Sequence, residues 1–267
     1  MDPFLRQLLW GVLPTFVAMG LALVLGRKKK ELPIPGLALW LGLLAGTVGL
    51  LHSWPAFPPK TALLALPYVL LLSLFFFFAS EKKTARVSAR VVVAITGTQV
   101  FLNPLQKNVF EGNESLFWFV LLICSWLLLA PSAFFSLTER PRSWLLHTAI
   151  LSFLLALSIA MTGSLFLGQI LGLLAIAMMV LYLDAWILGP NFVTQGLADL
   201  GAMFFLLGIA LSYLASSTPA GIAILFALSL FVPILAALRP KGERPVWLLF
   251  GPSFLLALAG TAWAYFS

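Results

Sequence analysis

Ten long apolar segments, separated by short polar connections, fill this chain from one end to the other. They lie at residues 4–26, 34–54, 61–80, 87–104, 115–137, 143–161, 164–188, 197–216, 219–238 and 246–266. At about 1.5 Å per helical residue, each is long enough to cross a hydrocarbon core about 30 Å thick, the fourth only just. Helices are the expected structure, because an open sheet leaves backbone groups unpaired in lipid.

The composition agrees with a chain that is surrounded by lipid. Hydrophobic residues make up 61% of it and charged residues 9%, whereas a soluble domain carries about a quarter charged residues. Too few charges are present to build a water-facing surface of ordinary size. We therefore predict an all-α fold, a polytopic membrane helix bundle of about ten transmembrane helices. Residues 1–267 form a single integral membrane domain in this interpretation, with no soluble domain.

The positive charges predict an orientation. The run Arg27–Lys30 follows the first segment, and cations in short connections favour the cytoplasmic side. With this run inside, 13 of the 16 lysines and arginines fall in inner connections, and only Arg6, Lys60 and Lys107 lie outside. We expect a cell (inner) membrane protein with both termini outside the cytoplasm. The net charge of +7 is then explained by the bilayer and does not indicate nucleic-acid binding.

Two segments share a glycine pattern. Segment two contains Gly42 and Gly46, and segment seven contains Gly168 and Gly172, both as G-x-x-x-G, a spacing that lets two helices approach closely. The two segments are equivalent in a five-plus-five division and run in opposite directions, as an inverted repeat requires. Chance is the alternative, because glycine and leucine are frequent in membrane helices.

Metal, haem and disulfide chemistry find no support in the sequence. The two histidines, His52 and His147, belong to opposite ends of the predicted bundle, so they cannot grip one metal ion or haem. The single Cys124 excludes an intramolecular disulfide. We predict no metal site and no cofactor, and we interpret His147 as an interfacial or bundle-facing polar residue.

Two aspartates flank the connection between segments seven and eight. The stretches Tyr182-Leu183-Asp184 and Gly196-Leu197-Ala198-Asp199 resemble the YD and GxGD motifs of intramembrane aspartyl proteases. An extra residue separates Tyr182 from Asp184, and Ala198 stands where the motif has its second glycine. The resemblance implies an aspartate pair that activates water.

The other interpretation treats both aspartates as helix-end charges. Asp199 near a helix N-terminus is favoured by the helix dipole, and either aspartate can pair with Arg90, Arg140 or Arg142. We predict this second arrangement, with no catalytic dyad. Arg90 itself has a long stem that reaches the inner headgroups from within segment four.

Uncharged polar side chains give the candidate binding site. Segment four carries Thr96, Gln99 and Asn103, and segment seven carries Gln169. Both glutamines lie about five residues from an outer end, or about 7–8 Å deep, where an amide needs a partner. They either tie neighbouring helices together, worth about 0.6 kcal/mol on average, or line a polar pocket open to the outside. The pocket hypothesis requires segments four and seven to lie close together.

The leading functional hypothesis is transport or binding of a small neutral or lipid-like solute. The alternatives are a scaffold or accessory subunit of a membrane complex and an intramembrane hydrolase that uses the aspartate pair. The sequence favours a protein that is not an enzyme. Its expected partners are the lipid bilayer and either a small solute or other membrane proteins, with no nucleic acid.

Overall fold

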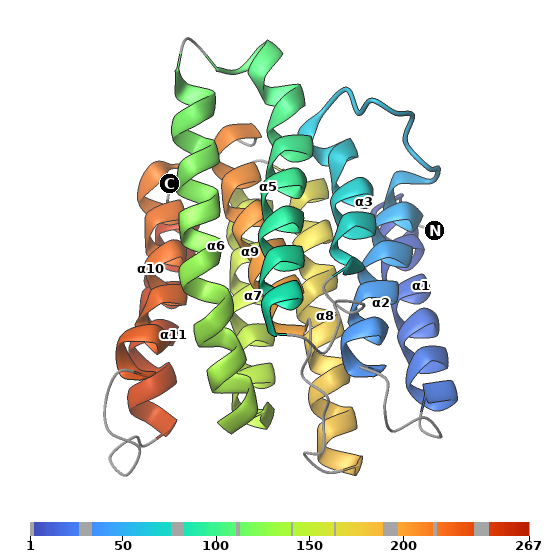
Figure 1. Cartoon of the computed structure of the whole chain (residues 1–267), viewed down its shortest axis with the longest axis vertical. Coiled ribbons are helices and arrows are strands. Elements are labelled where there is room, and N and C mark those ends of the chain that lie inside the picture. Colours follow the sequence, from blue (N-terminus) through green and yellow to red (C-terminus); the bar gives the residue numbers. More distant parts are fainter. Residues whose placement is uncertain are drawn as a thin grey trace.

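The computed structural model describes residues 3–26, 34–75, 83–110, 113–139, 141–162, 164–188, 197–215, 218–237 and 246–266. Within these ranges the chain forms ten α-helices and no strand (Figure 1). The helices are α1 (Pro3–Gly26), α2 (Ile34–Leu51), α3 (Ala62–Ser73), α5 (Lys83–Asn108), α6 (Glu114–Glu139), α7 (Pro141–Thr162), α8 (Leu165–Leu188), α9 (Leu197–Ala215), α10 (Ala220–Ala237) and α11 (Val246–Phe266). The expected all-α fold is confirmed.

Each predicted segment corresponds to one helix, and most boundaries agree within a few residues. The largest differences concern α3 and α5. Helix α3 ends at Ser73 instead of residue 80, and residues 76–82 lie outside the described ranges. Helix α5 begins at Lys83, four residues before the predicted start. Lys83 and Arg86 are therefore helical, because a polar helix turn precedes the apolar stretch on which the prediction depends.

Two of the described helices are long and apolar enough to cross a membrane by length and composition. They are the stretches Arg142–Thr162 of α7 and Leu165–Ile187 of α8. Other apolar stretches of the described residues are shorter, for example Leu9–Leu21 and Asp199–Leu214. Helices α7 and α8 pack against each other in opposite directions.

Helix α9 lies at the centre of the bundle. Every residue from Asp199 to Ser212 is buried, which fits a helix that is apolar on all sides. It packs against α6, α10, α8 and α2. The large side chains Phe204 and Phe205 are among those that fill the space between α9 and its neighbours. The other helices are thus arranged around α9.

Glycines bring α1 and α2 into close contact. A Cβ atom on Gly46 would lie 2.1 Å from Thr15 Oγ1, and one on Gly49 would lie 2.1 Å from the Trp10 carbonyl oxygen. The Thr15 hydroxyl is buried here and donates to the carbonyls of Gly11 at 2.9 Å and Gly42 at 3.1 Å. The close approach expected from the glycine spacing of segment two is therefore confirmed.

The glycine pattern of segment seven behaves differently. A Cβ atom on Gly168 would lie 2.7 Å from the Ala156 carbonyl oxygen, so this glycine permits the close packing of α8 on α7. A Cβ atom on Gly172 would meet nothing within 4 Å. Only the first of the two glycines therefore serves a helix contact within the described structure.

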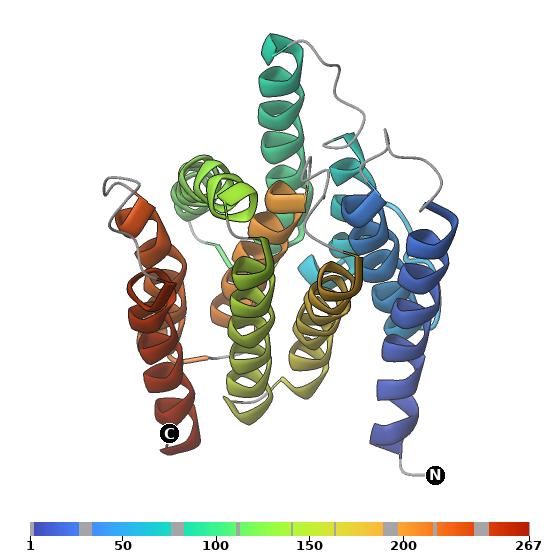
Figure 2. The same cartoon turned by 90° about the horizontal axis from the view of Figure 1, so that it is seen from below.

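Both chain termini lie at the same end of the bundle, together with the connection between α7 and α8 (Figure 2). The five-plus-five hypothesis makes α2 and α8 equivalent, and these two helices do pack together. It also pairs α6 with α11 and α9 with α3. If the two halves were equivalent, the contact of α6 with α9 would be matched by a contact of α11 with α3. Helix α11 packs along α10 and α7 instead. The contacts between the two halves thus agree with an inverted repeat only in part.

The contact between α1 and α2 gives a stability prediction. We expect Gly49→Ala to lower the free energy of unfolding by about 1–3 kcal/mol, because the new methyl group meets backbone that cannot move aside. Gly20→Ala in α1 is the matched control, since its Cβ meets nothing within 4 Å and alanine favours the helix. Thermal unfolding in detergent measures both. Equal effects of the two substitutions would contradict the close packing.

Candidate functional site

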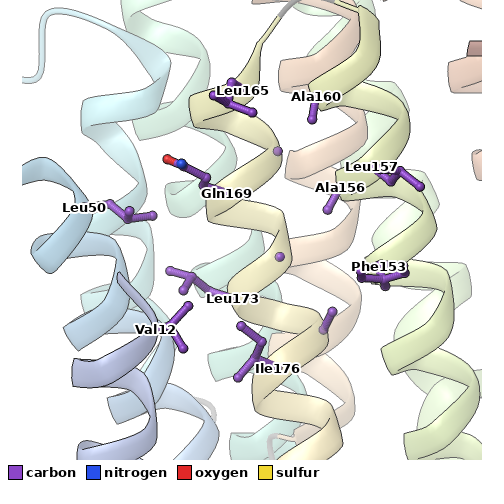
Figure 3. Close-up of a pocket in the computed structure, with 13 residues that line it drawn as sticks. Val12, Leu50, Phe153, Ala156, Leu157, Ala160, Leu165, Gln169, Leu173 and Ile176 are labelled. Carbon is purple, nitrogen blue, oxygen red and sulfur yellow. The ribbon is translucent and has the colours of Figure 1, made fainter. Parts of the chain in front are cut away.

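A groove of about 240 Å³ runs along α8, between α1 and α2 on one side and α7 on the other (Figure 3). Helix α8 forms its floor from Leu165 to Ile176, and the groove is open on one side. Its walls carry Val12 and Leu50 opposite side chains of α7. The α7 residues of the wall are Phe153, Ala156, Leu157 and Ala160. The groove surface is almost entirely apolar, and no charged side chain is among its lining residues.

Gln169 is the one strongly polar side chain of this groove. It lies one helical turn after the start of α8, and Figure 3 shows its amide extending to the side on which Leu50 lies. The residue is only 8% exposed. Neither amide atom, Nε2 or Oε1, has a hydrogen-bond partner. Burying a polar group without a hydrogen-bond partner costs about 1–3 kcal/mol of folding free energy. The amide of Gln169 is therefore an unfavourable feature of an otherwise apolar region.

Two hydroxyl groups share this property. Thr47 of α2 and Ser152 of α7 are both buried, and neither Oγ atom has a partner. Together with Gln169, they are the buried side chains of the described structure that have unpaired polar atoms. All three belong to the helices that border the groove. The unpaired buried atoms of the described residues therefore belong to α2, α7 and α8.

The other predicted binding residues lie elsewhere. Thr96, Gln99 and Asn103 are exposed on α5, which packs mainly against α3 and α6. None of them lines the groove beside Gln169. A Cβ on Gly97 would lie 3.5 Å from Val69 of α3, so this glycine does not face α8 either. The expectation that both glutamines share one polar pocket is therefore wrong. Equal depth along two helices does not determine whether those helices are neighbours. A binding role for the three α5 residues stays a prediction.

An ion pair links α5 to the central helix. Arg90 Nε donates to both carboxylate oxygens of Asp199 at 3.0 and 2.9 Å, and Arg90 Nη2 lies 2.6 Å from Asp199 Oδ1. The Asp199 side chain is 5% exposed and that of Arg90 23%. Trp126 Nε1 of α6 donates to the Asp199 carbonyl oxygen at 3.5 Å. The predicted use of Arg90 as a partner is confirmed, and the contact fixes α5 and α6 against α9.

This pairing leaves no support for an aspartate dyad. Both carboxylate oxygens of Asp199 are occupied by Arg90. Asp184 lies near the end of α8, half-buried, and has interactions of its own. In the described structure the two carboxylates do not hydrogen bond to each other. For Asp199 the arrangement matches the prediction of a helix-end charge that pairs with an arginine.

His147 belongs to a second buried polar contact that the sequence did not reveal. Its Nε2 lies 3.0 Å from Ser253 Oγ of α11, and Ser253 donates its hydroxyl to the Ser229 carbonyl of α10 at 2.5 Å. His147 therefore donates to Ser253. The serine proton points to a backbone carbonyl and Ser253 is fully buried, so the pair ties α7, α10 and α11 together instead of providing a nucleophile. Residues 106 positions apart give no local signal of such a contact.

Among the described residues, no three histidine, cysteine, aspartate or glutamate side chains come together to hold a metal ion. Comparison with protein-family models and with curated proteins finds no match to this chain. The groove and its amide are therefore interpreted from their own chemistry.

The ion pair predicts strong coupling between α5 and α9. We expect Arg90→Met to lower the free energy of unfolding by about 3–5 kcal/mol, because a buried carboxylate loses its partner. The double variant Arg90→Met with Asp199→Leu removes both charges and should recover most of that loss. Unfolding in detergent of the two single variants and the double variant measures the coupling. Additive losses would show that the two residues act independently.

Proposed function

We propose that this chain is a multi-span membrane protein that binds a lipid-like solute in the groove along α8. The proposal combines the ten apolar segments of the sequence with the ten helices that match them. A chain with 9% charged residues needs a solvent other than water for most of its surface. The bilayer meets this requirement, because an α-helix pairs the backbone groups of its interior within itself.

The outward faces of the bundle support a lipid environment. Large apolar side chains point away from the core on α1, α6 and α11, for example Leu13 at 59%, Phe117 at 63% and Leu255 at 66% exposed. Soluble monomers rarely expose apolar patches of more than a few hundred Å². Polar contacts such as Ser158 to Thr261, at 3.2 Å, lie between helices instead. This distribution is what a lipid-facing bundle requires.

Aromatic rings support a membrane boundary beside the connection between α2 and α3. Trp54 and Phe57 are exposed and pack edge-on against Tyr68, with ring centroids 5.7 and 5.3 Å away. Tryptophan and tyrosine rings favour the interface between lipid and water, because they combine apolar bulk with a polar tip. The α1 and α2 helices run in opposite directions, so this connection belongs to the end at which the chain begins. We propose that this end faces away from the cytoplasm.

The groove is the observation that carries the functional proposal. It is open to the side of the bundle, and its lining offers a solute almost nothing but hydrocarbon. This favours a lipid-like solute over a small polar one. A polar solute would lose its hydration in such a groove without gaining enough hydrogen bonds in return. Entry from the surrounding lipid requires no passage through water.

An accessory subunit of a membrane complex is the alternative that one observation favours. The bare surface at Gly172, with Gly168 one turn away, is the kind of site at which a second helix packs. The lining favours a hydrocarbon chain instead. It is almost entirely apolar over the stretch from Leu165 to Ile176, which spans about 16 Å at the helical rise.

Filling the groove tests the proposal. In Gly172→Leu the new side chain enters the empty space above α8, because a Cβ at this position meets nothing within 4 Å. We expect the variant to fold like the wild type and to lose most of its groove labelling by a phospholipid with a diazirine in its acyl chain. Peptide mass spectrometry after irradiation in vesicles locates the labelled residues.

Gly251→Leu on α11 is the matched control, because a Cβ there also meets nothing within 4 Å. It should leave labelling at Phe153, Leu157 and Ile176 unchanged. Wild-type protein with no labelling at these residues would overturn the proposal. So would a Gly172→Leu variant that is folded and labelled as strongly as the wild type.

A further inference from the structure

The groove is polar at one level only. Gln169 lies at the end of the groove that begins with Leu165, and the floor beyond it, from Gly172 to Ile176, is apolar. A molecule that lies along the groove therefore has one buried amide near one of its ends and hydrocarbon along the rest. This is the polarity of a single-chain amphiphile, with its head beside Gln169 and its tail toward Ile176.

The hydrocarbon part of such a molecule gains little by entering the groove. Lipid tails are as apolar as leucine, so transfer of a chain from the bilayer to an apolar wall changes its free energy only slightly. The unpaired amide is different, because both its donor and its acceptor are buried without a partner. A head group that pairs with Gln169 removes this cost, and the selectivity of the site then depends on that contact.

The chemistry of the walls restricts the head group. No lysine, arginine, aspartate or glutamate lines the groove, and a charge placed there without a partner is strongly disfavoured. A primary amide offers one acceptor oxygen and two donor hydrogens. The complementary head is an uncharged group that both donates and accepts, such as a hydroxyl, an amide or a protonated carboxyl group.

We infer that Gln169 is the recognition residue for the uncharged, hydrogen-bonding head of a single-chain lipid that occupies the groove along α8. The inference rests on the proposed function and adds the class of ligand and its direction. The side chain has three rotatable bonds and lies beside Leu50 (Figure 3), so rotation of the amide toward the bound head brings the two together. The head group lies near the end of the bundle that holds both termini.

The test compares ligands on the wild-type chain first. Full-length protein in detergent is labelled with a monoacylglycerol that has a diazirine in its chain, and unlabelled competitors are added. Monoolein, which has a glycerol head, should compete about tenfold better than 1-octadecene, which has the chain without a hydrogen-bonding head. Equal competition by these two molecules would overturn the inference without any substitution in the protein.

Substitutions then address the residue itself. Gln169→Leu should weaken competition by monoolein about tenfold and leave that by 1-octadecene unchanged. Gln106→Leu is the matched control, since this amide is exposed on α5 and outside the groove, and it should change neither. If Gln169→Leu fails to fold, Gln169→Asn retracts the amide by one methylene group and should also weaken monoolein selectively.

The outcomes separate this inference from the proposed function. Groove labelling that persists with no preference for monoolein and no effect of Gln169→Leu would overturn the role of the amide and leave the groove as a lipid site. An absence of groove labelling in the wild type would overturn both. Labelling lost in Gly172→Leu, together with head-group selectivity lost in Gln169→Leu, is the result we expect.

Discussion

Helix α9 is enclosed by other helices, and the arrangement of the bundle depends on the contacts along it. Its residues from Asp199 to Ser212 are all buried, so α6, α10, α8 and α2 pack around it. The charged exception lies in its first turn, where Asp199 is buried and paired with Arg90. The first turn of α9 thus holds α5 through an ion pair, and the rest of α9 contacts its neighbours through close side-chain packing.

Shape matters more than hydrophobicity if the bundle lies in lipid, because apolar side chains gain little by leaving one hydrocarbon environment for another. Close contacts and interhelical hydrogen bonds then provide the association energy. The structure uses both, with Gly46 and Gly49 between α1 and α2, and with Ser253 between α7, α10 and α11. The groove lacks both kinds of contact. A Cβ atom on Gly172 would meet nothing within 4 Å, and the amide of Gln169 has no hydrogen-bond partner. Both observations favour a ligand in the groove.

Much of the fold was predictable from the sequence because apolar segments and helices have the same extent. Polar connections interrupt the pattern, and helix boundaries follow them closely except near Ser73 and Lys83. The Arg90 partner of Asp199 was among the predicted choices, because both residues lie near predicted inner helix ends. The site was predicted less well. Depth along a helix can be counted from sequence, and it placed Gln169 correctly near the start of α8, but it wrongly joined this residue to Gln99.

Lateral neighbours are the information that such a sequence lacks. Nearly every face of these helices is apolar, so hydrophobic periodicity does not show which face meets which helix. The contact between His147 and Ser253 joins residues far apart in the chain, and neither has a distinctive local motif. Glycine spacing gave partial help. It marked a closely packed face of α2 without naming α1 as the partner, and in α8 it marked one closely packed glycine and one that faces open space.

Site-directed labelling in intact cells tests the central claim, a ten-span membrane bundle with both termini on the outer side, most directly. The exposed Cys124 is first replaced by serine, and single cysteines are then introduced at Lys28, Lys60 and Lys241. An impermeant maleimide should label position 60 from outside, and positions 28 and 241 only after the membrane is permeabilised. Labelling of positions 28 and 241 in intact cells, with position 60 protected, would contradict the orientation. Equal labelling of all three in a soluble extract would contradict the membrane bundle itself.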